Sequence, residues 1–181
     1  MTTIDYLFRR VIPTACDLLP EEMRSPRATA MLLAIALQES KARARVQFNG
    51  PARGFWQFEI AGVAGVIRHA ATKDHLLFAL DTLCYKRTLK PAILQAALED
   101  NDVLACVFAR LNLWWLPSAL PDSDAPDDGW RQYLEAWNPG TPRPETWPDN
   151  FARAWAIVNT PIETLTKHDR LLLKRLSVRE D

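Results

Sequence analysis

The chain has 181 residues, of which 48% are apolar, and its 22 Lys+Arg residues balance 22 Asp+Glu residues. This length suits one domain with a real core, and the apolar content excludes global disorder. A formally neutral chain gives no electrostatic case for nucleic acid or an anionic membrane surface as the main partner, whereas an uncharged polymer such as a polysaccharide is compatible with it.

The N-terminal segment predicts a first helix rather than a targeting sequence. Thr2 or Thr3 can cap this helix, and apolar residues follow at helical spacing until Pro20. Asp5 and the pair Arg9-Arg10 interrupt the apolar run, so we do not expect a signal peptide, and no run is long enough to span a membrane. We therefore expect a protein made in the cytoplasm that does not insert into a membrane.

The next predicted helix is the centre of the domain. Ser25 is suited to cap it and Pro26 to occupy its first position. The helix should run from residue 27 to about 42, and it is almost wholly apolar over residues 28–37, so it is expected to be buried on most sides. Its polar end, Gln38-Glu39-Ser40, should emerge where the core meets solvent.

The rest of the chain predicts short helices and loops. Residues 43–58 are expected to form an irregular loop or a short β-ribbon that turns at Asn49-Gly50-Pro51. Helical patterns follow at residues 62–83 (one or two helices), 89–100, 100–116 (a second buried helix capped by Asn101 or Asp102), 129–137 and 145–159. The expected class is mainly α, with one domain over residues 1–165 and a charged tail or final helix over 166–181.

The cysteines and histidines predict neither a disulfide framework nor a metal site. Cys16, Cys84 and Cys106 lie far apart in apolar helical patterns, and we expect three buried thiols. The three histidines are scattered, and the spacings typical of zinc ligands are absent. No metal and no cofactor are expected.

Glu39 is the first candidate for chemistry. A carboxyl at the end of a buried helix lies beside a medium of low dielectric constant, which raises its pKa and suits it to act as a general acid near neutral pH. No other acid follows until Glu59. The segment between the two holds four basic residues, Lys41, Arg43, Arg45 and Arg53.

Two short motifs carry a family resemblance. Gln38-Glu39-Ser40, followed by Gly54-Phe55-Trp56-Gln57, resembles the Glu-Ser and Gly-Leu-Met-Gln signature of soluble lytic transglycosylases and goose-type lysozymes, in order and in spacing. The resemblance covers roughly residues 28–65. It implies a lysozyme-like helical domain whose Glu ends a buried helix, while the Gly-to-Gln element lines the opposite side of a substrate cleft.

The resemblance also implies a role for each matched residue. Glu39 would be the general acid/base, and Gln57 would bind amide or hydroxyl groups of the substrate. Ser40 would hydrogen-bond near Glu39 or only finish the helix. Gly54 would allow close backbone approach or form a turn. The remaining assignments are Phe55 and Trp56 as sugar-stacking residues, with at least one of them buried, and Tyr133 as a stand-in for a family Tyr that has no counterpart in the helix at 100–116.

The implied reaction needs only one carboxylate. Glu39 would protonate the oxygen of the β-1,4 bond between N-acetylmuramic acid and N-acetylglucosamine in peptidoglycan, and the muramic 6-hydroxyl would close the ring to an anhydro product. A hydrolytic variant would use a second acid, with Glu59 as the candidate ahead of Asp74 or Asp81.

A second, weaker resemblance concerns the C-terminal part. The stretch from Trp130 to Pro142, which contains Tyr133, Trp137 and Pro139-Gly140, resembles the end of phage-encoded lysozyme-like proteins. It implies a phage or prophage source, with delivery to the cell wall by phage-type release or in a virion. The alternative interpretation is a lysozyme-like virion or tail component, or a glycan-binding protein, with weak catalysis or none.

Overall fold

The computed structural model describes residues 2–86 and 90–160 of the chain. Every regular element in these two ranges is helical, which confirms the predicted mainly α class. The elements are α1 (Thr3–Tyr6), η1 (Leu7–Val11), α2 (Ile12–Asp17), η2 (Glu21–Met23), α3 (Pro26–Ser40), α4 (Ile60–Arg68), α5 (Ala70–Thr82), α6 (Pro91–Ala97), α7 (Asp102–Trp114), α8 (Pro126–Trp137), η3 (Pro144–Thr146) and α9 (Trp147–Val158). No helix within the described ranges is both long enough and apolar enough to cross a bilayer.

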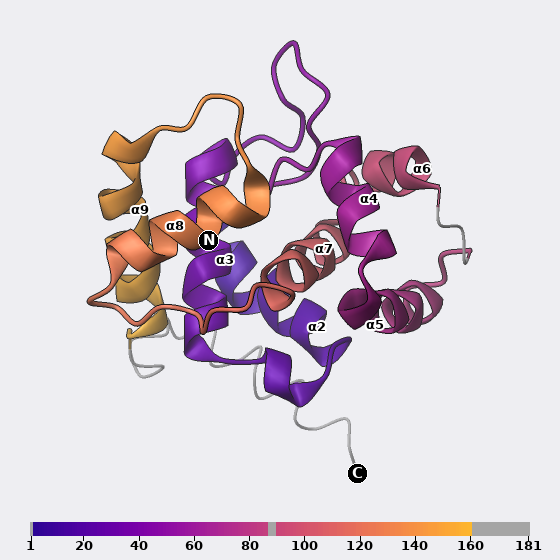
Figure 1. Ribbon diagram of the computed structural model, residues 1–181, viewed down its shortest axis with the longest axis horizontal. Helices are drawn as coiled ribbons and strands as arrows, with labels where there is room; N and C mark the ends of the chain where they lie inside the picture. The colour runs from indigo at the N-terminus through magenta and orange to yellow at the C-terminus, as the bar shows by residue number, and fades with distance from the viewer. Residues whose placement is uncertain (1, 87–89, 161–181) are drawn as a thin grey trace.

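Helix α3 is the central helix, as predicted. The Ser25 hydroxyl accepts a hydrogen bond from the Ala28 N–H at 3.0 Å, and Pro26 occupies the first helical position. Almost every side chain from Ala28 to Leu37 is buried. Figure 1 shows α8 and α9 on one side of α3 and α4 to α6 on the other, and both α9 and α7 pack against it.

The end of α3 fixes the position of Glu39. Lys41 and Ala42 both adopt left-handed backbone conformations, with φ of 55° and 50°. Their N–H groups close the helix by bonding to the carbonyls of Leu37 (3.0 Å) and Ala36 (2.9 Å). The helix therefore ends at Ser40, slightly earlier than expected, and Glu39 lies on its last turn.

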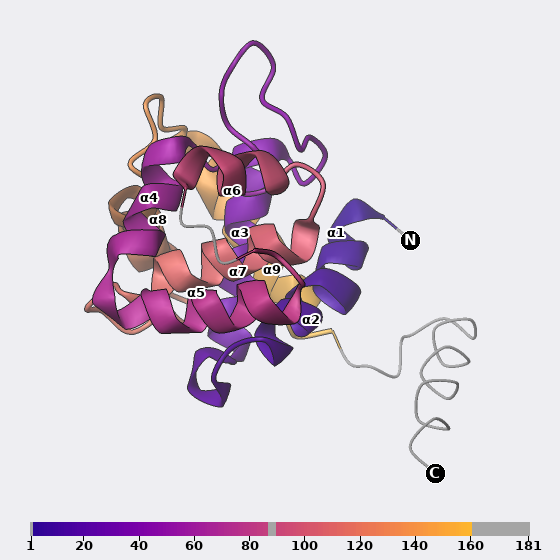
Figure 2. The ribbon, with the colours of Figure 1, turned by 90° about the vertical axis from the view of Figure 1, so that its right-hand side faces the viewer.

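The segment after α3 is irregular rather than a β-ribbon. It contains only two isolated bridges, Val46 with Arg53 and Arg53 with Phe58, and no strand forms in the described ranges. Figures 1 and 2 both show this loop extending away from the helices, and the Phe48 side chain is 91% exposed. The base of the loop is fixed by the Arg45–Asp102 ion pair, whose closest atoms are 2.7 Å apart.

Gly54 is required where this loop returns to the core. Its φ is +74°, and an added Cβ would lie 3.0 Å from the Leu98 carbonyl oxygen and 3.1 Å from the Ala105 Cβ. We expect Gly54→Ala to lower the free energy of unfolding by about 1–3 kcal/mol, because the left-handed conformation and the contact with backbone are both unfavourable. Denaturant unfolding measures this effect.

Gly140→Ala is the control for that substitution, because a Cβ at Gly140 would meet nothing within 4 Å. Its unfolding midpoint should stay close to that of the wild type. Equal stability of the two variants would contradict the role assigned to Gly54.

Three sequence predictions about individual residues and segments are refined or corrected. The helical pattern at 62–83 forms two helices, α4 and α5, and Asn101 caps α7 by accepting from the Leu104 N–H at 2.9 Å. The prediction of three buried thiols is wrong for Cys84, which is exposed because the chain turns there in a left-handed conformation (φ 59°). The predicted tail at 166–181 lies outside the described residues.

Candidate functional site

The candidate site is built around the Glu39 carboxyl at the end of α3. The Tyr133 hydroxyl, from α8, donates a hydrogen bond to Oε1 of Glu39 at 2.6 Å. The Tyr133 ring is buried and stacks on Trp147 of α9, with ring centroids 5.3 Å apart. Since two packed helices hold Tyr133, it can hold the Glu39 carboxyl in one orientation.

The environment of Glu39 favours its protonated form. Burial raises the pKa of this carboxyl, and the negative charge of Glu59 adds to the increase, while the Tyr133 hydrogen bond and the positive charge of Arg143 lower the pKa in part. The net direction is upward from the ordinary value. Burial also raises the pKa of Tyr133, as do the charge and hydrogen bond of Glu39, so the phenol keeps its proton and remains a donor.

Glu39 opens into a cleft of about 750 Å³. The walls come from the end of α3, the segment leading into α4, the end of α7, and the stretch from α8 through residue 143. Among the lining residues are Glu39, Gln57, Glu59, Tyr133 and Arg143. A cavity of this size lies within the range of small-molecule binding sites.

The structure brings four of the predicted site residues together at this cleft: Glu39, Gln57, Glu59 and Tyr133. Gln57 has a φ of 50°, and its side-chain N–H donates to the Gly54 carbonyl at 2.7 Å. This bond fixes the carboxamide and leaves its oxygen as an acceptor. Asp74 and Asp81, the other candidates for a second acid, lie on α5 and do not line the cleft.

Phe55 and Trp56 do not reach the cleft, which corrects their predicted role as sugar-stacking residues. Both side chains are 0% exposed, and the Trp56 indole N–H donates to the Leu32 carbonyl of α3 at 2.8 Å. The chain turns inward at this point, so the pair packs into the core beside α3. The expectation that at least one of them is buried holds for both.

Ser40 and Gly54 also lie outside the cleft lining. The buried Ser40 hydroxyl is 3.0 Å from the Ala36 carbonyl oxygen and 2.8 Å from the Phe55 carbonyl oxygen. It joins the end of α3 to the loop, which agrees with the structural alternative of the prediction rather than with substrate binding. Gly54 acts through the close backbone approach described above.

The cleft is lined by two other aromatic residues, Trp115 and Trp137, in place of Phe55 and Trp56. Trp137 is half-buried, and its indole N–H donates to the Trp56 carbonyl at 2.8 Å. Trp115 is also half-buried and packs edge-on against His69, with centroids 4.7 Å apart. Both tryptophans line the cleft and can offer ring surface to a sugar. The sequence shows that the chain is rich in tryptophan, but it does not show which tryptophans are exposed at the cleft.

Arg143 is a charged residue of the cleft that the sequence analysis did not identify. It lines the cleft, and its guanidinium bonds to the backbone carbonyl of Gln38, next to Glu39. Its positive charge would stabilise Glu39 once the carboxyl has lost its proton. No local pattern pairs Arg143 with Glu39, because the contact depends on how the segment after α8 folds back onto α3.

No group of three His, Cys, Asp or Glu residues in the part of the chain that the structure describes could hold a metal ion. Comparisons with known proteins add no relative: no protein family, no curated protein and no solved structure matches this chain.

Proposed function

We propose that this chain is a lysozyme-like enzyme that cleaves the β-1,4 bond between N-acetylmuramic acid and N-acetylglucosamine in peptidoglycan. The observation that supports this function best is the Glu39 carboxyl, whose pKa is raised by burial and which Tyr133 orients at the wall of a cleft. The resemblance of the segments around Glu39 and Gln57 to lytic transglycosylases and goose-type lysozymes supports the choice of substrate.

The proposed reaction begins with proton transfer. Protonated Glu39 gives its proton to the glycosidic oxygen as the bond from that oxygen to the muramic C1 breaks. The substrate's own N-acetyl group stabilises the cationic C1. Ionised Glu39, supported by the Tyr133 hydroxyl and the charge of Arg143, then accepts the proton of the muramic 6-hydroxyl as that oxygen bonds to C1.

A hydrolytic variant of this reaction would use Glu59. Its carboxyl is exposed at the cleft and contributes to the electrostatic field at Glu39. In that case Glu59 would orient or deprotonate a water molecule that attacks C1, and the product would carry a reducing end.

The second candidate function is glycan binding without cleavage, as in a virion or tail component. Trp115 and Trp137, with the buried Asn112 amide, line the cleft independently of Glu39. Aromatic rings and amides are the groups that bind sugars, so this surface could retain a glycan even if no bond breaks.

Release of dye from labelled, purified peptidoglycan tests the proposed enzyme. We expect the wild type to release dye, and co-sedimentation with unlabelled peptidoglycan separates the two candidate functions. Sedimentation with no release, where a known lysozyme releases dye, would favour the binding protein. Neither sedimentation nor release would contradict both.

Tyr133→Phe should change the pH dependence of cleavage as well as its rate. Loss of a hydrogen bond to a charged carboxylate should lower activity about 10-fold. Because the Tyr133 bond lowers the pKa of Glu39, its removal should raise that pKa further and move the alkaline limb of the kcat/KM profile to higher pH.

Tyr6→Phe is the matched control, since the Tyr6 hydroxyl bonds to Asp102 at 3.0 Å, away from the cleft lining. Its profile should overlay that of the wild type. A Tyr133→Phe profile with an unmoved alkaline limb would show that Tyr133 does not act on the acid.

A further inference from the structure

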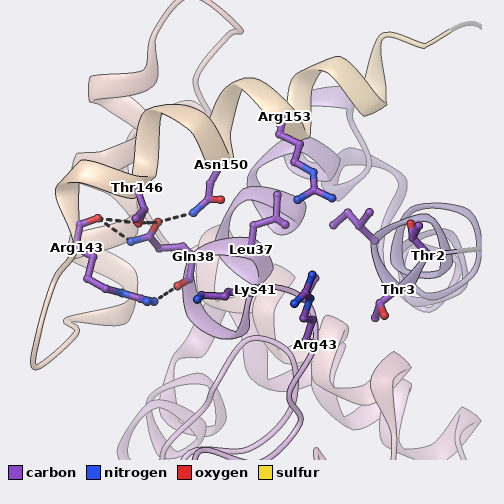
Figure 3. Close-up of a pocket in the computed structure, with 12 residues that line it drawn as sticks. Thr2, Thr3, Leu37, Gln38, Lys41, Arg43, Arg143, Thr146, Asn150 and Arg153 are labelled. Atoms are coloured by element: carbon purple, nitrogen blue, oxygen red, sulfur yellow. Dashed lines mark hydrogen bonds between the residues drawn. The ribbon is translucent and has the colours of Figure 1, made fainter.

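A second pocket, here called the basic pocket, lies against the other side of the end of α3. Its volume is about 620 Å³, and its cationic lining residues are Lys41, Arg43, Arg143 and Arg153. Figure 3 shows that these side chains come from three separate segments: the loop after α3, the turn before η3, and α9. The N-terminal residues Thr2, Thr3 and Ile4 form the remaining edge.

The described lining of the basic pocket carries positive charge and no acidic side chain. Within the described ranges, none of its lining residues is Asp or Glu. Figure 3 shows the guanidinium groups of Arg43 and Arg153 extending into the same space from opposite walls. The two positive charges repel each other when the pocket is empty. An anion between them would be attracted by both and would offset this repulsion.

Three of the four cationic side chains have no hydrogen-bond or ion-pair partner among the residues that the structure describes. Arg143 is engaged, because its guanidinium bonds to the Gln38 carbonyl. The side chains of Lys41, Arg43 and Arg153 are exposed and make no hydrogen bond or ion pair with any residue that the structure describes. Their donors are therefore free for a ligand.

One wall of the pocket is built on hydrogen bonds of the buried Gln38 side chain. The Gln38 side chain is 1% exposed, and its carboxamide oxygen accepts from the Thr146 hydroxyl (3.0 Å) and the Asn150 amide (2.8 Å). Its N–H donates to the Arg143 carbonyl at 2.9 Å. These bonds fix the start of α9 against α3 and so hold Arg153 opposite Arg43 (Figure 3).

We propose that the basic pocket binds a ligand that contains phosphate groups, held between Arg43 and Arg153 with Lys41 as a third cation. Guanidinium groups match phosphate oxygens in pairs, and a phosphate monoester carries about −1.5 to −2 charges at neutral pH with three acceptor oxygens. Three free cations suit that charge better than the single charge of a carboxylate. The proposal does not depend on peptidoglycan cleavage.

Asp5, which is bonded to the pocket residue Thr2, indicates where the phosphate would lie. Asp5 accepts hydrogen bonds from the Thr2 N–H (3.1 Å) and hydroxyl (2.6 Å) at the start of α1. Its carboxylate would repel a phosphate at that edge. The ligand should therefore lie toward α9 and the loop after α3, between the two arginines.

Calorimetric titration with tripolyphosphate at low salt tests the site. We expect the wild type to bind, and Arg43→Gln and Arg153→Gln each to weaken binding on the order of 10-fold through loss of a charge-assisted hydrogen bond. Arg131→Gln is the control, because it removes the same charge from an exposed arginine of α8 that does not line the pocket.

Further titrations identify the source of the phosphate. Tighter binding of poly(glycerol phosphate) than of tripolyphosphate would indicate a phosphodiester polymer, and the reverse would indicate a free phosphate compound. Absence of tripolyphosphate binding by the wild type would overturn the proposal. Equal weakening in Arg131→Gln, or equally tight binding of citrate, would overturn it as well.

Discussion

Glu39→Gln should reduce cleavage of peptidoglycan on the order of 10³-fold, because general acid catalysis typically contributes 10²- to 10⁴-fold to a rate. Glutamine has nearly the same shape as the protonated acid, and its carbonyl oxygen can still accept the Tyr133 hydrogen bond. The variant should therefore fold and bind glycan while it loses the transferable proton. Initial rates of dye release measure the effect.

The matched control is Glu22→Gln in η2, where the carboxyl is exposed and does not line the cleft. Its rate should equal that of the wild type. A Glu39→Gln variant that cleaves peptidoglycan as fast as the control would contradict the role of Glu39 as the acid.

The stability of the wild type relative to Glu39→Gln should also depend on pH. The folded state raises the pKa of Glu39 above its ordinary value of 4.5, so it binds more protons than the unfolded state just above that pH. Stability contributed by the protonated carboxyl is therefore present at low pH and declines as pH rises through the folded pKa. Glu39→Gln should become more stable relative to the wild type over that rise, as denaturant unfolding at several pH values can measure.

Trp56→Ala should lower the free energy of unfolding by about 3–5 kcal/mol, the usual cost of removing a buried aromatic side chain. The substitution leaves a cavity beside α3 and removes the indole hydrogen bond to the Leu32 carbonyl. Gln57 follows directly in the chain, so activity should fall as well. Chemical denaturation and the rate of dye release measure the two effects.

Two further variants test whether the loss of stability in Trp56→Ala comes from lost packing in the core. Trp56→Phe keeps an apolar ring but loses the N–H, so it should cost less than the alanine variant. Phe48→Ala removes a 91% exposed ring and should change the stability by less than about 0.5 kcal/mol. If Phe48→Ala were as unstable as Trp56→Ala, the assignment of Trp56 to the core would be wrong.

The parts of the fold that are set by neighbouring residues could be predicted. The Ser25 cap and the apolar stretch at 28–37 identify α3 as a buried helix, and they place Glu39 on its last turn. The sequence also places the start of α7 at Asn101 or Asp102, and Asn101 is the residue that caps it. Glu39, Gln57 and Glu59 lie at one cleft, in agreement with the motif spacing.

The remaining features depend on contacts between distant segments. Burial of at least one of Phe55 and Trp56 was predicted, but no periodicity in residues 43–58 indicates that both turn inward, with the Trp56 indole N–H bonded to the Leu32 carbonyl. Arg143 reaches α3 only through the folding of the segment after α8. The four basic residues between Glu39 and Glu59 make other contacts: Arg45 pairs with Asp102, Arg53 pairs with Glu99, and Lys41 and Arg43 line the basic pocket.

Mass spectrometry of the products from purified peptidoglycan, digested with the wild type and with Glu39→Gln, tests the central claim most directly. The account predicts new muropeptides from the wild type alone. Anhydro-muropeptides would identify a lytic transglycosylase, and reducing-end muropeptides would identify a lysozyme whose second acid is sought first at Glu59. No glycan fragments from the wild type, under conditions where a known lysozyme produces them, would contradict the assignment of Glu39 as the acid of a peptidoglycan-cleaving enzyme.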